Sequence, residues 1–369
     1  MEFLKSLYKK YEHLSSPVFF IFGFLLDVFT LGRVDDLSNI IILSLYFAVS
    51  LFIFVIEFDV IESHSENRSI TTNAEYNPLL SVIVKYKDEI FHFSQGALLS
   101  AFTLFFFKSA SLSVSFLFMI FITTVLLMNE LPIFQKLGPS IKSILFSLNL
   151  FSLYLVYVPL AIGKLGGWVF SLTCLLYIVF SVFFTFFILR KTKKPTMIKK
   201  IWIHPATIIF LMFITLRWLN LIPPVPLSLE TAGIFHNIEK KYPSYHLFYQ
   251  KEWWRFWNTS SEYFRYKRPQ KIYFFTRIFA PGGFEDDVIV HWQKYVKGEW
   301  STTDKIPLKI TGGRKKGYRG LAFKSNYSDG LWRIRVETRS GSEIGRLNFQ
   351  IERATPDYNL PNQERIDSN

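Results

Sequence analysis

A series of apolar stretches, each near the length of a membrane-spanning helix, fills the first 222 residues and constrains the fold more than any other feature. A helix rises about 1.5 Å per residue and the hydrocarbon core of a bilayer is about 30 Å thick, so a span needs about 20 residues. Seven stretches approach this length, and the first is short enough to be re-entrant. They cover residues 17–34, 38–58, 89–107, 110–129, 143–163, 166–189 and 203–222. We therefore expect an α-helical polytopic membrane bundle of about seven spans over residues 1–226.

Basic residues between these stretches predict the orientation of the bundle. Six cationic side chains lie within the eleven residues 190–200, and Lys and Arg beside a span resist translocation. With the basic N-terminus also inside, the predicted cytoplasmic segments are 1–16, 59–88, 130–142 and 190–202. Seven spans then place the C-terminal part outside the cytoplasm, and an error in the first span would reverse this assignment.

The hydrophobic pattern changes to a period of two at Lys271, which is typical of β-strands. Short alternating runs such as DVIVHWQKYV and IGRLNFQIE are separated by the turn signals PGGFEDD, GEWSTTD, GGRKKG, SDG and SGS. Six or seven short strands in about 85 residues favour an all-β, immunoglobulin-like sandwich over residues 271–352. The polar, proline-containing residues 353–369 are expected to be a disordered tail.

Residues 227–270 are expected to form an amphipathic connector rich in aromatic and basic residues. The first part has helical spacing, because Leu229, Ile234, Phe235 and Ile238 can share one face. Aromatic and cationic residues then alternate over 251–268, a mixture favoured at a membrane interface. This mixture also suits stacking on sugars, and the alternative is that the aromatic residues seal the next domain onto the bundle.

The overall charge and the cysteine content limit the partners and the stabilising bonds of the chain. It carries a formal net charge of +13 and a single cysteine, Cys174, so an intrachain disulfide is impossible. A domain outside the cytoplasm must then be held by its hydrophobic core. Basic charge beside the lipid bilayer favours anionic lipid, an envelope glycan or an envelope protein as partner. A solvated basic surface is the alternative, and no nucleic acid is expected.

Ionisable residues at membrane depth form the first candidate site. Asp27, Arg33, Asp35 and Asp36 lie within or beside the first apolar stretch, and Glu130 follows the fourth. A carboxylate at the centre of a span costs roughly 2.5–3.5 kcal/mol, so it needs a partner or a polar cavity. These five residues indicate an ion, proton or substrate site, or else structural pairs near the interface.

The segment GGRKKGYRG, residues 312–320, is the second candidate site because it concentrates positive charge between glycines. Such a loop can bind a phosphate or a carboxylate, can face lipid headgroups, or can be a charged hairpin turn. The residues expected to bind an anion or partner are Arg314, Lys315, Lys316, Tyr318 and Arg319.

Familiar catalytic and metal-binding motifs are absent from the sequence. It contains no G-x-x-x-x-G-K-[ST], G-x-S-x-G, H-E-x-x-H or C-x-x-C. Neither His92 nor His204 has a second ligand at metal-binding spacing. We therefore predict no catalytic residue, no metal and no cofactor, and enzymatic activity is not favoured.

Several sequence elements of the C-terminal part are shared with a known family. They are His291-Trp292, Gly312-Gly313-Arg314, Gly330 with Trp332-Arg333, and the last strand around Phe349. With these elements, residues 272–351 resemble a bacterial family, domain-of-unknown-function family 2914. The upstream segment FGFLLDVFTLGRVDD is similar to membrane members that carry this domain at their end.

This resemblance implies a multi-spanning bacterial membrane protein, and it implies no activity, ligand or catalytic residue. The expected location is the bacterial inner membrane, with the N-terminus cytoplasmic and the C-terminal domain extracytoplasmic. The leading hypothesis is that the sandwich recognises an envelope component or partner protein while the bundle anchors or relays that contact. The alternative is a membrane enzyme or transporter with a polar site in the bundle.

Overall fold

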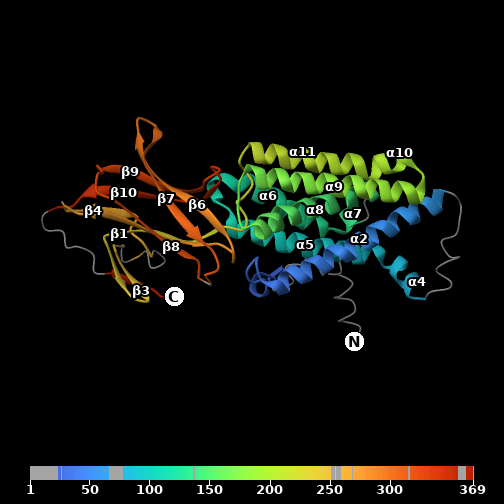
Figure 1. Ribbon diagram of the computed structural model, residues 1–369, viewed down its shortest axis with the longest axis horizontal. Helices are drawn as coiled ribbons and strands as arrows, with labels where there is room; N and C mark the ends of the chain where they lie inside the picture. Colours follow the sequence, from blue (N-terminus) through green and yellow to red (C-terminus); the bar gives the residue numbers. More distant parts are fainter. Residues whose placement is uncertain are drawn as a thin grey trace, which may run out of the picture. The chain divides into compact units, whose positions relative to one another are not determined.

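The computed structural model shows two compact units, one helical and one made of strands (Figure 1). It describes residues 24–25, 27–65, 78–135, 138–250, 254, 259–267, 269–314, 316–355 and 363–368. The helical unit comprises Met1–Phe107, Leu117–Val158 and Trp168–Leu221. The β unit comprises Lys108–Phe116, Pro159–Gly167 and Ile222–Asn369, so it takes in two loops that join helices. The predicted order, helices first and strands after, is confirmed.

Six helices of the described residues are long and apolar enough to cross a membrane. The helices are α2 (Leu37–Ser65), α4 (Pro78–Lys85), α5 (Lys87–Ser109), α6 (Leu112–Asn129), α7 (Pro132–Gln135), α8 (Pro139–Ile162), α9 (Gly167–Thr192), α10 (Pro195–Ile198), the π-turn η1 (Lys199–Ile203) and α11 (His204–Trp218). The six candidates correspond to the second to seventh apolar stretches of the sequence. Residues 17–23 and 26 of the first stretch, 17–34, lie outside the described residues.

Stacked aromatic rings form the core of the helical unit. Phe54 of α2 lies 4.9 Å from Phe146 of α8 and 5.6 Å from Phe184 of α9, measured between ring centroids. Trp202, presented by η1, lies 4.9 Å from Phe184 and is fully buried. Offset and edge-to-face rings add attraction beyond the area that they bury, so the abundant phenylalanine fixes how these helices pack.

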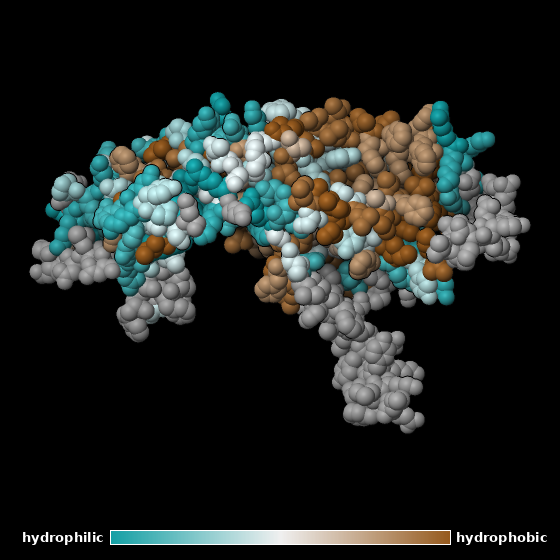
Figure 2. All heavy atoms as spheres, turned by 60° about the horizontal axis from the view of Figure 1, so that its bottom comes forward, coloured by the Kyte–Doolittle hydropathy of each residue, from teal (hydrophilic) through white to brown (hydrophobic). Residues whose placement is uncertain are grey.

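The exterior of the helical unit is apolar as well. Helix α9 exposes Leu175, Val179, Val182, Phe183 and Phe186. Figure 2 shows hydrophobic residues over much of the visible face of the helical unit and hydrophilic residues over much of the β unit. A monomeric soluble protein rarely exposes so large an apolar surface, so this surface requires an apolar environment or a partner.

Eleven strands of the described residues form three sheets in the β unit. The strands are β1 (Ser228–Phe235), β2 (Asn237–Lys241), β3 (Ser244–Tyr249), β4 (Tyr263–Tyr266), β5 (Ile272–Phe279), β6 (Glu285–Val296), β7 (Glu299–Thr311), β8 (Tyr318–Lys324), β9 (Gly330–Thr338), β10 (Glu343–Arg353) and β11 (Gln363–Asp367). The sheet orders are β1-β5-β8, β4-β10-β9-β6-β7 and β11-β3-β2. All pairs are antiparallel except β4 with β10.

The main core lies between the β1-β5-β8 sheet and the five-stranded sheet. It contains Trp292 of β6 and Trp332 of β9, packed with Phe274 of β5 and Phe349 of β10. A second core, around Phe235, Leu247, Tyr249 and Phe275, covers the opposite face of the β1-β5-β8 sheet. Successive strand residues point to opposite faces, so Ile234 enters the main core while its neighbour Phe235 enters the second.

Two predictions for the ends of the β unit are wrong. Residues 228–235 and 237–241 are strands rather than a helical connector, because β1 pairs with β5 and buries side chains on both of its faces. The spacing that resembled a helical face reflects this burial on two sides. The tail is not wholly disordered either, since Gln363–Asp367 is strand β11 and pairs with β3. Most of the aromatic-basic segment 251–258 lies outside the described residues.

The loop Pro159–Gly167 contacts the start of β6 within the β unit. The Glu285 amide donates to the Gly163 carbonyl at 3.0 Å, and the Leu165 amide donates to the Asp286 carboxylate at 3.2 Å. Gly163 has φ +72°, and a Cβ there would collide with the carbonyl of Gly283. Residue 163 therefore has to be glycine for this loop to lie against the start of β6.

We expect His236, which joins β1 to β2, to make the β unit sensitive to acid. Its buried ring stacks on Phe264 at 4.1 Å, and burial lowers the pKa of His236 to about 4. The pKa of His236 is lower in the folded than in the unfolded state. The stability that the neutral ring contributes is therefore fully present above about pH 6.5 and is lost as pH falls toward 4. Between pH 6.5 and 5 the free energy of unfolding should fall by roughly 2 kcal/mol for this reason.

The measurement is the unfolding free energy of the full chain against pH, compared with that of His236→Gln. The variant cannot gain a proton at this position, so its stability should fall less on acidification. An identical pH dependence in the two proteins would contradict the prediction.

Candidate functional site

A row of basic side chains crosses the outer face of the five-stranded sheet. Lys305 of β7 lies opposite His291 of β6, which lies opposite Arg335 of β9, which in turn lies opposite Arg346 of β10. These side chains point outward because their strand neighbours, such as Trp292, are buried in the core. Like charges directly opposite on neighbouring strands are destabilising, so the basic row requires compensation.

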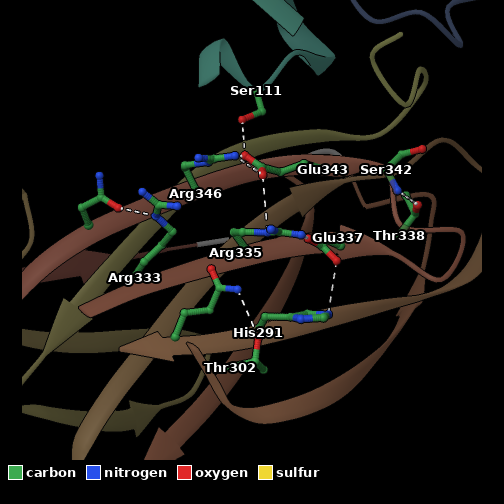
Figure 3. Close-up of polar contacts among 12 residues, drawn as sticks. Ser111, His291, Thr302, Arg333, Arg335, Glu337, Thr338, Ser342, Glu343 and Arg346 are labelled. Atoms are coloured by element: carbon green, nitrogen blue, oxygen red, sulfur yellow. Dashed lines mark hydrogen bonds and ion pairs between the residues drawn. The ribbon is translucent and has the colours of Figure 1, made fainter. Parts of the chain in front are cut away.

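Two buried carboxylates provide part of this compensation (Figure 3). Glu337 lies 3.3 Å from His291 Nε2 and also contacts the Arg335 guanidinium. Glu343 accepts hydrogen bonds from Arg346 Nε at 2.7 Å and Nη2 at 2.6 Å, and it lies 3.6 Å from Arg335. The carboxylate side chains are only 6% and 4% exposed. Bidentate pairing of this kind fixes the arginine planes.

A residue from one of the helix-joining loops completes this network. The Ser111 hydroxyl donates to Glu343, and Ser111 belongs to the β unit together with the rest of Lys108–Phe116. Figure 3 shows Ser111 reaching Glu343 at the side away from Arg335. The loop thereby helps to position the carboxylate that orients two arginines.

A polar row lies beside the basic row. Gln293 donates to the Thr302 hydroxyl at 3.1 Å, and Arg333 donates to Asn348 at 2.9 Å. The Arg333 guanidinium also lies 3.9 Å from the centroid of the Trp300 ring. Cation–π stacking holds this guanidinium in place on a partly exposed surface, so its remaining donors can meet a ligand.

The local potential on this face is positive. Burial lowers the pKa of His291, and the charges of Lys305 and Arg335 lower it further. Burial also lowers the pKa of Arg333, with a contribution from Arg346. Four cations, including Arg333, face two carboxylates, which leaves two positive charges uncompensated. The planar N–H donors of an arginine side chain fit the oxygens of a carboxylate or phosphate group. This basic face is therefore suited to an anionic ligand.

The residues of the sequence elements shared with the known family divide between the two faces of the sheet. Trp292 and Trp332 lie in the main core, where Trp332 Nε1 donates to the Ser328 carbonyl at 2.8 Å. His291 and Arg333 lie on the outer face with the basic row. No group of three or more His, Cys, Asp or Glu side chains in the described part of the chain is placed to hold a metal ion.

The basic loop predicted to bind an anion contacts an acidic residue of the same chain. Arg319 Nε lies 2.8 Å from the Asp367 carboxylate. Lys316 donates to the Ser368 carbonyl at 3.4 Å, and Arg314 lies 5.4 Å from the Tyr318 ring. Lys315 lies outside the described residues.

The candidate intramembrane residues have several different partners. Asp27 accepts a hydrogen bond from Ser100 at 2.5 Å, whereas Arg33 pairs with Asp35 at 2.7 Å. The Arg33 amide donates to Asp36 at 2.9 Å. Arg33 and Asp35 thus form a pair of the structural kind, whereas Asp27 contacts α5.

Glu130, the fifth candidate, lies just after α6. It accepts a hydrogen bond from Asn129 Nδ2 at 3.1 Å, and burial raises the pKa of Glu130. The same Asn129 side chain lies 2.9 Å from His92 Nδ1 of α5. Glu130 thus belongs to a polar contact between α5 and the end of α6.

A partly buried ionic cluster that the sequence reasoning missed joins three helices. Lys142 of α8 lies 3.0 Å from Glu57 of α2 and 2.6 Å from Asp88 of α5. Lys87 contacts the same two carboxylates. The sequence did offer a signal, since Glu57 lies near the end of one apolar stretch and Lys142 just before another. It does not show which helices are neighbours, so the pairing could not be predicted.

A pair of buried amides continues this polar contact along the same helices. Asn149 Nδ2 donates to Gln95 Oε1 at 2.6 Å, and both residues are fully buried. The pairs Asp88–Lys142 and Gln95–Asn149 have the same sequence separation of 54. Helices α5 and α8 therefore run parallel, and their interface contains polar contacts at two positions along the helices.

One family model matches part of the β unit. The family described as "Protein of unknown function (DUF2914)" matches residues 285–351. This range runs from β6 into β10 and contains the whole basic row. The resemblance expected for the C-terminal domain is confirmed over this range. No curated protein matches the chain.

Several solved structures are similar to part of the chain. An immunoglobulin-like protein from Pseudomonas aeruginosa is 9% identical, with 35% of this chain and 98% of that chain covered and a TM-score of 0.22. A β-glucosidase from Listeria innocua in complex with gluconolactone is 9% identical, with 26% and 15% covered and a TM-score of 0.19. A β-glucosidase from Kluyveromyces marxianus in complex with glucose is 8% identical, with 37% and 15% covered and a TM-score of 0.18.

The similarity covers most of the immunoglobulin-like protein but only a small part of each glucosidase. The chain spans only about 15% of the length of the two glucosidases. TM-scores at this level carry no argument about fold or function, so the function has to be argued from the residues of the β unit.

Proposed function

We propose that the chain is a multi-pass protein of the bacterial inner membrane whose extracytoplasmic, immunoglobulin-like β unit binds an anionic envelope component. The helices anchor this unit in the bilayer. Six helices of suitable length and composition support the membrane location, together with the apolar exterior of α9. The basic segment 190–200 supports a cytoplasmic loop before α11 and an external β unit after it.

The basic row is the observation that carries the proposed binding. Lys305, Arg335 and Arg346 lie on three strands of one face, with His291 between two of them. This arrangement costs stability through repulsion, and a ligand with several carboxylate or phosphate groups relieves that repulsion. The buried Glu337 and Glu343 hold the arginines in fixed planes, so less freedom is lost on binding.

We expect the full chain in neutral lipid nanodiscs to bind polygalacturonate or polyphosphate, and to bind vesicles containing phosphatidylglycerol if lipid is the ligand. The double variant Lys305→Gln with Arg333→Gln should weaken binding about tenfold, because it removes two charge-assisted contacts. Raising the salt concentration should weaken binding further, since exposed charges are screened.

Lys240→Gln is the matched control, because Lys240 is an exposed lysine on β2 in a different sheet. It should change the affinity less than twofold, as expected for one distant surface charge. Equal binding by wild type and the double variant, or no binding to any of the three probes, would refute the proposed function. A reporter fused after Pro226 that proved cytoplasmic would refute the orientation.

A further inference from the structure

The C-terminal strand β11 occupies the free edge of β3. It pairs antiparallel with β3 from Gln363 opposite Tyr249 to Asp367 opposite Tyr245, and β2 pairs with the other edge of β3. An open strand edge is a template for another extended segment. In this chain the segment that occupies it is the chain's own terminus.

Strand β11 buries almost no apolar surface. Gln363 and Glu364 are exposed, and Ile366, its one aliphatic residue, is 59% exposed. The strand is therefore held by backbone hydrogen bonds, by the buried Asp367, and by polar contacts of Glu364 with His246 and of Arg365 with Thr259. Segments with few buried apolar contacts open at low free-energy cost, so β11 can leave while the two hydrophobic cores stay intact.

Two arginines form a built site for the Asp367 side chain. Arg277 of β5 lies 2.8 Å from the carboxylate through Nη2 and donates to it from Nε at 3.0 Å, while Arg319 of β8 lies 2.8 Å away through its own Nε. The side chains of Arg277, Arg319 and Asp367 are 12%, 9% and 4% exposed. Two guanidiniums around one carboxylate form strong charge-assisted bonds.

The same arginines also donate hydrogen bonds to the backbone of the bound segment. Arg319 Nη2 donates to the Asp367 carbonyl at 3.0 Å, and Arg277 Nη2 donates to the Ser368 carbonyl at 2.7 Å. Arg319 is itself fixed by the Pro243 carbonyl at 3.0 Å and by the Tyr245 ring at 5.2 Å. Arg277 and Arg319 are directly opposite each other on β5 and β8, so an empty site would leave two buried like charges side by side.

We propose that the edge of β3, with Arg277 and Arg319, is a binding site for an extended acidic peptide, filled by the chain's own C-terminal strand and exchangeable with the same strand of a second copy. The site is distinct from the basic row of the five-stranded sheet and does not depend on the proposed function. The sequence QERIDS supplies both required features, a segment that pairs as a strand and an aspartate at the position of the two arginines.

The first test uses the chain truncated after Thr355, in detergent, and a labelled peptide of residues 361–369. Saturable binding is expected, and the full chain should bind at least tenfold more weakly because its site is filled. An Asp367→Asn peptide should lose at least tenfold in affinity, and Arg319→Gln in the truncated chain should have a similar effect. A Glu364→Gln peptide is the control and should change affinity less than threefold, since Glu364 pairs only with His246 near the surface. A folded truncated chain that does not bind, or that binds both acidic and Asp367→Asn peptides equally, would overturn the proposal.

The second test uses the full chain and addresses exchange directly, so that it is informative even if truncation prevents folding. Ile366 and His246 are opposite each other in the β11–β3 pair. Copies carrying Ile366→Cys, mixed with copies carrying His246→Cys, should form a disulfide-linked dimer under mild oxidation. In the control, copies carrying Lys297→Cys replace those carrying His246→Cys, and no disulfide-linked dimer should form. A chain carrying both Ile366→Cys and His246→Cys shows whether the two positions can be linked within one copy. If that chain forms its internal disulfide but the mixture gives no dimer, the exchange between copies is refuted.

Discussion

Replacing Trp292 with alanine is expected to destabilise the β unit by about 3–5 kcal/mol, the range for truncation of a large buried aromatic side chain. Trp292 is fully buried in the main core, and its ring lies edge-on to Phe274 at 6.5 Å and to Phe349 at 6.2 Å. Its loss would leave a cavity bordered by both sheets, since Phe274 and Phe349 come from different sheets. Chemical unfolding of the full chain, followed by tryptophan fluorescence, measures the effect.

Tyr295→Ala is the control for this prediction. Tyr295 lies on the same strand but is 41% exposed, so its replacement should cost less than about 1 kcal/mol. Similar losses for the two variants would mean that the core between the two sheets does not determine the stability of the β unit.

Replacing Lys142 with methionine is expected to destabilise the helical unit by about 3 kcal/mol, because removal of one partner leaves a buried charge less well compensated. Lys142 and Glu57 are only 7% and 9% exposed in their side chains. Glu57 keeps its contact with Lys87, which places the expected loss at the lower end of the range for buried pairs. Thermal unfolding in detergent, detected by far-UV circular dichroism, is the measurement.

The chain contains a matched exposed pair for comparison. Lys191 and Asp59 lie 2.6 Å apart, again between α2 and another helix, but they are 41% and 39% exposed. Lys191→Met should cost less than about 1 kcal/mol. Combining Lys142→Met with Glu57→Gln should restore part of the stability lost in the single variant. No recovery in the double variant would contradict an ion-pair origin of the effect.

The same double variant tests whether ligand binding by the β unit depends on the ionic cluster. If the helices serve only to anchor the β unit, ligand binding by the β unit should be unchanged once the double variant is folded. This follows because the ionic cluster is made entirely by residues of the helical unit.

The helices were accessible from sequence because length and hydropathy are local properties. Most of strands β5 to β10 was also recognisable from alternating or β-rich runs, but the start of β7 was predicted as the turn GEWSTTD and is strand from Glu299. Strand β1 was not recognisable, because Ile234 and Phe235 enter different cores, so that both faces are buried and the strand does not alternate. Its extended state depends on tertiary pairing with β5.

The candidate sites show a similar limit. Arg335 and Arg346 look like ordinary outward-facing residues in the sequence, and only the β9–β10 register brings them opposite each other. The basic loop was identified from composition, but its contact with Asp367 depends on a strand that the polar tail did not predict. The ionic cluster requires the knowledge that α2, α5 and α8 meet. Residue types are thus readable from sequence, whereas their convergence depends on register and helix neighbours.

The inclusion of Lys108–Phe116 and Pro159–Gly167 in the β unit affects how this protein can be made. During synthesis both loops emerge long before β6 and β10, so the surfaces that Gly163 and Ser111 contact are formed on chain segments that arrive later. The β unit therefore cannot be separated from the helical unit at a single boundary in the sequence. A recombinant fragment starting at Ile222 would lack a serine that contacts Glu343 and a glycine that binds the start of β6, so complementation with the missing loops becomes the natural way to study assembly.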